Sequence, residues 1–137
     1  MKKLILAILA IVPLLLPLPS RAAGDLAVVA IPATITSGTA LSPAIDLQIY
    51  RLFAISMPAS WTAAPITFQA SIDGVNYFNV YDDTGTEVSI TVAASQYVVL
   101  TTPAKMLGAR WLKVRSGPNS VPVNQGSTVV VNVVGVP

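Results

Sequence analysis

Residues 110–115, RWLKVR, carry the side chains best suited to binding. In a strand, Trp111, Lys113 and Arg115 would share one face, because alternate side chains of a strand point the same way. An indole beside two cations can stack on a sugar ring or hold an acidic partner. In the alternative interpretation, which we favour, Trp111 packs under the end of the sheet and the two cations are solvated. The other indole, Trp61, is a further candidate binding residue, but we expect it to fill the core or contact a subunit rather than bind a ligand.

Asp82, Asp83 and Glu87 form the one close acidic group of the sequence. Their carboxylates, with Thr84 and backbone carbonyls, are the oxygen ligands that calcium prefers. The spacing matches no regular calcium motif, so the simpler interpretation is a solvated turn in which Asp and Gly provide the geometry. We therefore expect no cofactor and keep calcium only as a candidate ligand of this group.

The sequence contains no histidine and no cysteine, which bears directly on catalysis. Their absence removes Ser-His-Asp and Cys-His nucleophiles, the usual zinc ligands and any disulfide. No serine lies in a Gly-x-Ser-x-Gly context, and no phosphate-binding glycine loop is present. The paired carboxylates of a glycoside hydrolase would have to come from one acidic turn. We predict that the protein is not an enzyme.

Residues 1–22 have the pattern of a secretory signal peptide. Lys2 and Lys3 precede an uncharged, proline-interrupted apolar run, and residues 20–22 offer small side chains at a peptidase site. A retained hydrophobic anchor is the alternative, and residues 1–22 would then be the only contact with a membrane. Cleavage after Ala22 would leave five basic and six acidic residues, a net charge of −1. The basic composition therefore gives no support to nucleic-acid binding.

Residues 66–81 predict a β-hairpin. The first half alternates apolar residues with Thr67, Gln69 and Ser71, so one face of the strand would be apolar and the other polar. Asp73 and Gly74 accept the positive φ angles of a tight hairpin turn. The second half would return as an aromatic-rich strand whose rings we expect mostly in the core. These rings belong to Tyr77, Phe78 and Tyr81.

Short apolar runs separated by turn residues continue along the chain, without the 3.6-residue period of a helix. At their spacing they predict an all-β fold, an antiparallel β-sandwich of about eight or nine strands resembling a jelly roll. No linker divides residues 23–137, so we expect one domain. The other expected strands are 26–31, 45–47, 50–57, 87–92, 97–101, 110–115 and 128–136; 32–43 and 116–126 would be loops and 103–107 a helical turn.

Four sequence blocks resemble small structural proteins encoded among tailed-phage and prophage genes. The blocks are SGTALSPAIDL (37–47), MPASWTAAPITFQASIDGV (57–75), RWLKVRSG (110–117) and PVNQ (122–125). The resemblance implies a virion component, a head decoration or tail accessory protein, that packs against other virion proteins or copies of itself. Charged residues make up 10% of the chain, against about 25% usually, which suits subunit packing.

The chain is also similar, over a shorter stretch, to galactose-binding-like sandwiches of the discoidin type. The pattern Ser-x-Asp-Gly at 71–74 and the strand Arg-aromatic-x-x-Val-Arg at 110–115 carry this similarity. It implies a secreted carbohydrate-binding module that uses Trp111 with Lys113 and Arg115. A third hypothesis is a membrane-tethered domain that keeps its leader. The expected location is the virion, or the extracellular space if the leader is cleaved.

Overall fold

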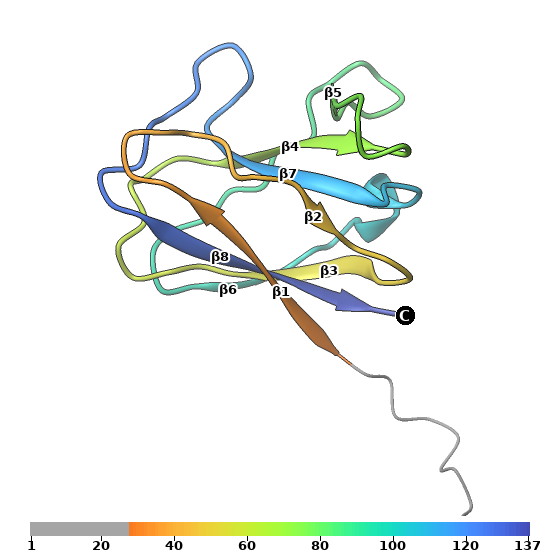
Figure 1. The fold of residues 1–137 in the computed structure, drawn as a ribbon, viewed down its shortest axis with the longest axis horizontal. Helices are drawn as coiled ribbons and strands as arrows, with labels where there is room; N and C mark the ends of the chain where they lie inside the picture. Colours follow the sequence, from red (N-terminus) through yellow and green to blue (C-terminus); the bar gives the residue numbers. More distant parts are fainter. Residues whose placement is uncertain (1–27) are drawn as a thin grey trace, which may run out of the picture.

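The computed structural model describes residues 28–137. The predicted leader and the first residues of the strand expected at 26–31 lie outside the described residues. Eight strands of the described part form two antiparallel four-stranded sheets in separate layers (Figure 1), which confirms the predicted β-sandwich. The elements are β1 (Val29–Ile35), β2 (Ile45–Asp46), β3 (Arg51–Ser56), β4 (Ile66–Ser71), β5 (Phe78–Asn79), β6 (Tyr97–Val99), the 3₁₀ helix η1 (Pro103–Met106), β7 (Trp111–Ser116) and β8 (Val129–Val136).

The order of the strands is that of a jelly roll. One sheet has the order β1-β8-β3-β6 and the other β2-β7-β4-β5. Strand β1 therefore pairs with β8, β2 with β7, β3 with β6 and β4 with β5, like a long hairpin wrapped around a barrel. This nested pairing is the double Greek key of the jelly-roll architecture.

One core lies between the two sheets. In β8, Val129, Val131 and Val133 are buried and alternate with Val130 and Asn132, which point outward. The period of two therefore explains how a strand rich in valine on both faces supplies three core residues. Burying each such side chain contributes about 1.5–3 kcal/mol relative to leaving it exposed. The core also contains fully buried side chains of the other sheet, among them Ile66, Phe68, Leu112 and Val114.

Two expected strand boundaries are wrong. Strand β1 continues through Pro32 to Ile35, where a loop is predicted, because β1 is an edge strand and proline needs no N–H partner on the free side. The expected strand at 87–92 forms only isolated bridges. Its N–H groups bond different strands, Val88 to Val80 and Ile90 to Ile66, so no continuous ladder develops.

The predicted hairpin is present, but its turn is wider than expected. The last paired residues are Ala70 and Phe78, so the connection is not the two-residue turn that Asp-Gly suggests. The side chain of Asp73 accepts the N–H groups of Val75 (2.9 Å) and Asn76 (2.8 Å), and Gly74 has a φ of +74°. This side-chain cap widens the turn and shortens the return strand to β5.

The aromatic residues of the hairpin do not lie in the core, contrary to expectation. Phe78 is 71% exposed and Tyr81 is also exposed, while Tyr77 is half-buried. Phe78 pairs with Ala70 and therefore shares the inward face of the sheet, but β5 is a two-residue edge strand, so the ring lies beside the smaller surface cavity at the rim of the sandwich and stays exposed.

Candidate functional site

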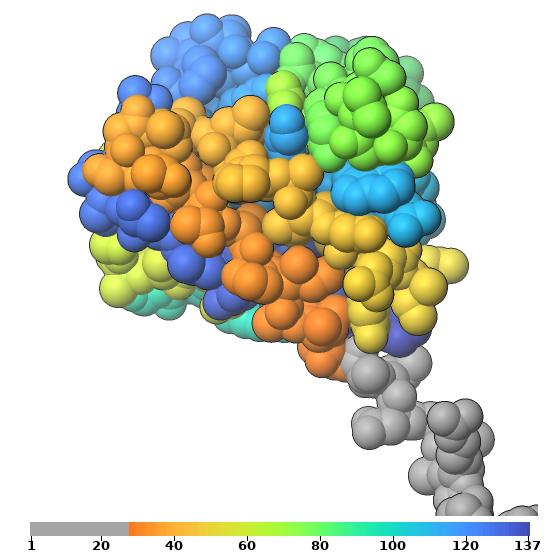
Figure 2. Space-filling view, viewed as in Figure 1, coloured from red at the N-terminus to blue at the C-terminus, as the bar shows by residue number. Residues whose placement is uncertain are grey.

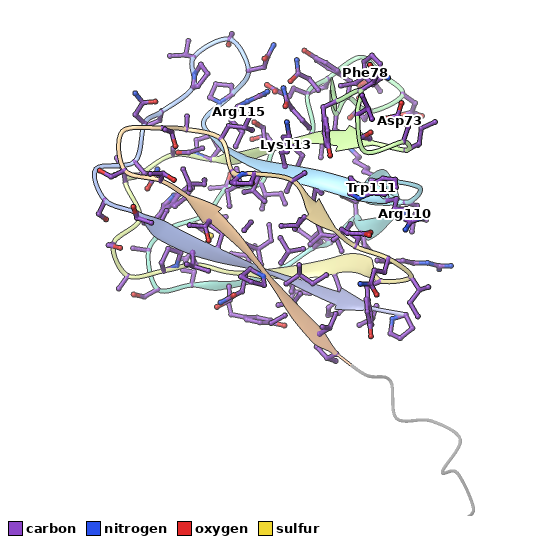
Figure 3. All side chains as sticks on the ribbon, in the orientation of Figure 1. Asp73, Phe78, Arg110, Trp111, Lys113 and Arg115 are labelled. Atoms are coloured by element: carbon purple, nitrogen blue, oxygen red, sulfur yellow. The ribbon has the colours of Figure 1, made fainter. Side chains whose placement is uncertain are left out.

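The predicted binding side chains of β7 lie on the outer face of the β2-β7-β4-β5 sheet (Figure 3). The register pairs Trp111 with Ser71, Lys113 with Gln69 and Arg115 with Thr67. The three residues of β7 share one face of their strand, as do their three partners on β4, and the alternation in the sequence predicts both correctly. Antiparallel pairing makes these two sets of side chains neighbours. Other residues of the chain cover much of this outer face, so its side chains are not simply solvated.

Arg115 is buried, which corrects the prediction that it is solvated. The residue is 4% exposed, and its guanidinium donates to Asn79 Oδ1 at 2.6 Å and to Glu87 Oε1 at 3.4 Å. Glu87 also accepts the backbone N–H of Asn119, at 3.0 Å to Oε1 and 3.1 Å to Oε2. Arg115 therefore attaches the chain after β4 and the loop after β7 to the outer face of the sheet, and its charge is satisfied within the chain.

Trp111 is half-buried on the outer face, not under the end of the sheet. The guanidinium carbon of Arg110 lies 4.3 Å from the centroid of the ring. A Cβ atom added to Gly74 would lie 3.2 Å from Cε2 of the indole, so the backbone of the turn rests on the ring. Figure 3 places Arg110 and the loop that carries Asp73 on opposite sides of Trp111. Ligand stacking on a face of this indole would require Arg110 to move.

Lys113 is half-buried and is covered by Tyr77. The ammonium nitrogen lies 4.0 Å from the centroid of the phenol ring, a cation–π contact. The hydroxyl of Tyr77 donates to the carbonyl of Gly74 at 3.3 Å, which fixes the ring within its own turn. In the space-filling view, light-blue atoms of β7 reach the surface beside and below the green hairpin (Figure 2).

Trp61 is a core residue and is not available as a ligand platform. It is 6% exposed, belongs to the main hydrophobic cluster and donates Nε1–H to the carbonyl of Ala64 at 3.1 Å. Its inclusion among candidate binding residues is therefore wrong, while the core position that we favour for it is correct.

The three acidic residues considered for calcium do not converge. Glu87 is paired with Arg115, while Asp82 lies in a turn and bonds Lys105 at 2.9 Å. Asp83 is exposed and separate from both interactions. Within residues 28–137, no group of three or more His, Cys, Asp or Glu side chains could hold a metal ion. In the same residues, no helix has the length and apolar character needed to cross a membrane.

Two aspartates have pKa values held well below the usual range. The N–H groups of Asn76 and Val75 lower the pKa of Asp73, because they bond its charged form. The hydroxyl of Thr84 and then the ammonium of Lys105 lower the pKa of Asp82. Both carboxylates therefore remain ionised as fixed hydrogen-bond acceptors of turns, which is the opposite of what a proton-transfer group requires.

Gln125 is a buried polar residue that the sequence interpretation missed. It is 1% exposed; Nε2 donates to Ser116 Oγ at 2.7 Å, and Oε1 accepts the N–H of Thr62 at 2.8 Å. Its backbone carbonyl accepts the N–H of Gly38 at 2.8 Å. Each of these four residues comes from a different block of the phage resemblance. The blocks therefore meet at one end of the sandwich as a structural network; no local pattern around Gln125 signals it.

The outer face of the other sheet differs in composition. Its outward side chains are uncharged, and Arg51 stands only at the end of the face. Tyr97 is 58% exposed and Val99 51% exposed, and Val130 is exposed as well. The residues in the outward rows are Ala30, Pro32 and Thr34 of β1, Val130, Asn132 and Val134 of β8, Ala54 and Ser56 of β3, and Tyr97 and Val99 of β6. Of these, Ala54 and Val134 are themselves buried.

Two surface cavities lie beside the sandwich. One, of about 520 Å³, runs between residues 86–91 and 98–106, and its charged lining residues Asp82, Glu87 and Lys105 are paired within the chain. The other, of about 310 Å³, is lined mainly by apolar side chains, including Phe78 and Leu107.

Comparison with protein-family models, with curated proteins and with solved structures found no match. A jelly roll by itself does not imply a function. The function must therefore be inferred from the two outer faces and the edges of the sandwich.

Proposed function

We propose that this protein is a non-enzymatic structural component of a phage particle, a head decoration or tail accessory protein that acts by packing against neighbouring subunits. The observation that carries this proposal is the uncharged outer face of the β1-β8-β3-β6 sheet. Charged residues are depleted at the centres of protein interfaces, and contiguous exposed apolar surface marks interaction sites. The four sequence blocks supply the phage setting.

The size of the face suits repeated rather than isolated contacts. Four strands spaced about 4.8 Å apart, with about six residues of about 3.4 Å each, give a face of roughly 400 Å². A stable interface buries about 800 Å² on each partner. One such face is therefore too small for a tight single contact, whereas a particle that presents many copies can hold a subunit through several contacts at once.

The paired charges of the described residues support a structural role. Arg115 is paired with Glu87, and Lys105 with Asp82, so these charges hold loops in place. A catalytic centre would instead need a titratable group poised near the working pH. This distribution favours a scaffold over an enzyme.

Mass spectrometry and negative-stain microscopy of purified particles test the proposal. We expect the chain in particles at a regular copy number, and its absence from them would refute the proposal. Val130→Lys places a charge on the uncharged face and should lower the copy number. Val121→Lys, in an exposed loop, is the matched control and should leave the copy number unchanged.

A secreted carbohydrate-binding module is the second candidate. It is favoured by the position of Trp111, because displacement of the exposed Arg110 alone would free one face of the indole. A glycan array tests it: we expect Trp111→Ala to abolish any hit, and an array without hits counts against this candidate. The mass of the mature protein separates both candidates from a membrane-tethered domain, since loss of the first 22 residues excludes a tether.

A further inference from the structure

The four edge strands of the sandwich differ in how they discourage pairing with another chain. Unprotected edges pair readily, and proteins blunt them with proline, charge or short length. Strand β1 carries Pro32, and β2 and β5 have two residues each. Strand β6 has three residues and contains neither proline nor charge. Its hydrogen bonds with β3 extend past its ends, from the carbonyl of Gln96 to the N–H of Leu100.

The backbone groups of Tyr97 and Val99 point to the free side of β6. Met57 N–H donates to Gln96 O, and Leu100 N–H donates to Phe53 O. In an antiparallel ladder, successive residues alternately bond the partner strand and direct their N–H and C=O groups away from it. Val98 therefore bonds β3, whereas the backbone groups of Tyr97 and Val99 point away from β3. No turn or loop bond within residues 28–137 uses these outward groups.

We propose that β6 pairs antiparallel with β6 of a second copy of this chain, so that the β1-β8-β3-β6 sheet continues across a two-fold axis. The axis would pass through Val98, with Tyr97 of each copy opposite Val99 of the other. This register forms four backbone hydrogen bonds within the strands themselves. A register centred on Val99 would use only two within the strands and would need Thr101 beyond them.

The side chains agree with this register. Tyr97 and Val99 both point to the outer face and are exposed. Across the axis each aromatic ring would contact a β-branched side chain, a favourable cross-strand pair. The two Val98 side chains would meet on the inner side, next to the core that Val98 already contacts.

Charge distribution favours a second copy as the partner. An edge that pairs with itself brings identical groups together, so any charge on it would face a like charge. Strand β6 has none, and the charges lining the adjacent cavity are already paired, Asp82 with Lys105 and Glu87 with Arg115. A two-fold contact of one surface with itself closes as a dimer and does not grow into a filament.

Pairing through β6 also enlarges the uncharged face. The outer faces of two copies would form one continuous surface of roughly 800 Å², the area per partner of a standard interface. The inference deepens the proposed function, on which it rests for its setting, by naming a second copy as partner. The dimer itself is measured in solution without any particle, so the two proposals can fail separately.

Analytical ultracentrifugation of the purified protein tests the pairing. We expect dimers that dissociate on dilution. Val99→Pro should raise the dissociation constant by about tenfold or more, because it removes an outward N–H donor from each copy while the bonds to β3 remain. Tyr97→Lys should act in the same direction. The control Thr34→Lys, on the same face but on β1, should keep the dimer. A monomeric wild-type protein, or equal dimerisation of Val99→Pro, would overturn the inference.

Cysteine cross-linking tests the register, because the natural chain contains no cysteine. Across the proposed axis the Cα atoms of Val98 would be about 4.5 Å apart, within reach of a disulfide. Val98→Cys should therefore give a covalent dimer on oxidation, and Val121→Cys should not. A folded Val98→Cys dimer that fails to cross-link would refute this pairing. Absence of the chain from particles would contradict the proposed function and leave the dimer intact.

Discussion

The two outer faces of this sandwich have opposite relations to the rest of the chain. The face of β4 and β7 carries aromatic and cationic residues, and residues after β4 and after β7 fold over it. The face of β8 and its neighbours carries small, apolar and hydroxyl side chains, and Tyr97, Val99 and Val130 remain exposed. The face with the more conspicuous chemistry is thus covered by other residues of the same chain, and the uncharged face is the one that we propose for partners.

The comparison separates two uses of polarity. Arg115 bonds Glu87 and Lys113 contacts the ring of Tyr77, so both charges stabilise segments that fold over the sheet. On the other face, the absence of charge removes a cost of docking, because no ion must lose its hydration there. A row of charged residues on a strand is therefore weak support for a ligand site until the structure shows what covers it.

Removing the contacts that hold residues 79–87 over the outer face of β4 and β7 should have the largest effect on stability. Arg115→Ala leaves Glu87 without its cation and Asn79 without its donor, so we expect a loss of about 3 kcal/mol in the free energy of unfolding. Urea denaturation measures the loss. The exposed Arg51→Ala is the control and should change stability by less than about 0.5 kcal/mol. Equal effects of the two variants would contradict the structural role of Arg115.

A smaller effect should follow from lifting the turn off Trp111. Gly74→Ala combines a φ of +74° with a Cβ only 3.2 Å from the indole, and we expect a loss of about 1–2 kcal/mol. Gly85→Ala is a matched control, since its φ is +79° and nothing lies within 4 Å of the added Cβ. The difference between the two isolates the contact. Tryptophan fluorescence should shift only in Gly74→Ala, and an unchanged spectrum would mean that the turn does not rest on the ring.

A modest pH dependence should also belong to the covered face. The folded-state pKa of Asp73 lies below its ordinary value of 3.8. Its contribution to stability is therefore complete above that value and is lost as the pH falls below it toward the lower folded-state pKa. Asp73→Asn keeps an acceptor oxygen and should flatten this acid loss in thermal melts. Asp83→Asn should retain the wild-type slope, and identical slopes for all three proteins would refute the assignment.

The smallest effect on stability is expected on the uncharged face. Val130→Lys replaces an outward, exposed side chain of β8, so the free energy of unfolding should change by less than about 0.5 kcal/mol. Thermal denaturation measures it. Val131→Lys, at the next position and fully buried, should unfold the protein. A large loss in Val130→Lys would show that this face is needed for folding and is not simply available to partners.

Local patterning was enough to predict much of the fold. The alternation in β4 and β7 predicts their faces correctly. The prediction of a tight turn after β4 is wrong because the side chain of Asp73 accepts the N–H groups of Val75 and Asn76, which produces a wider turn. The turn propensities of Asp73 and Gly74 alone do not tell whether the Asp73 side chain will compete for these backbone N–H groups.

The sequence did not predict which segments fold over the outer face of β4 and β7, because their contacts join residues that are far apart in the sequence. Arg115 bonds residues 28 and 36 positions away in the sequence, and Gln125 bonds Thr62, 63 positions away. Period and composition tell which side chains share a face but not which loop returns to it. The same limit explains why Trp61 was included among binding residues: its burial depends on elements that pack around it from the rest of the chain.

The pairing of β1 with β8 sets the order of events during biogenesis. These strands are the first and last of the described chain, and β8 also lies between β1 and β3. Their sheet therefore cannot close until Val129–Val136 has left the ribosome. Contacts between such distant segments slow folding. A truncation that removes β8 should leave β1 and β3 without a shared neighbour.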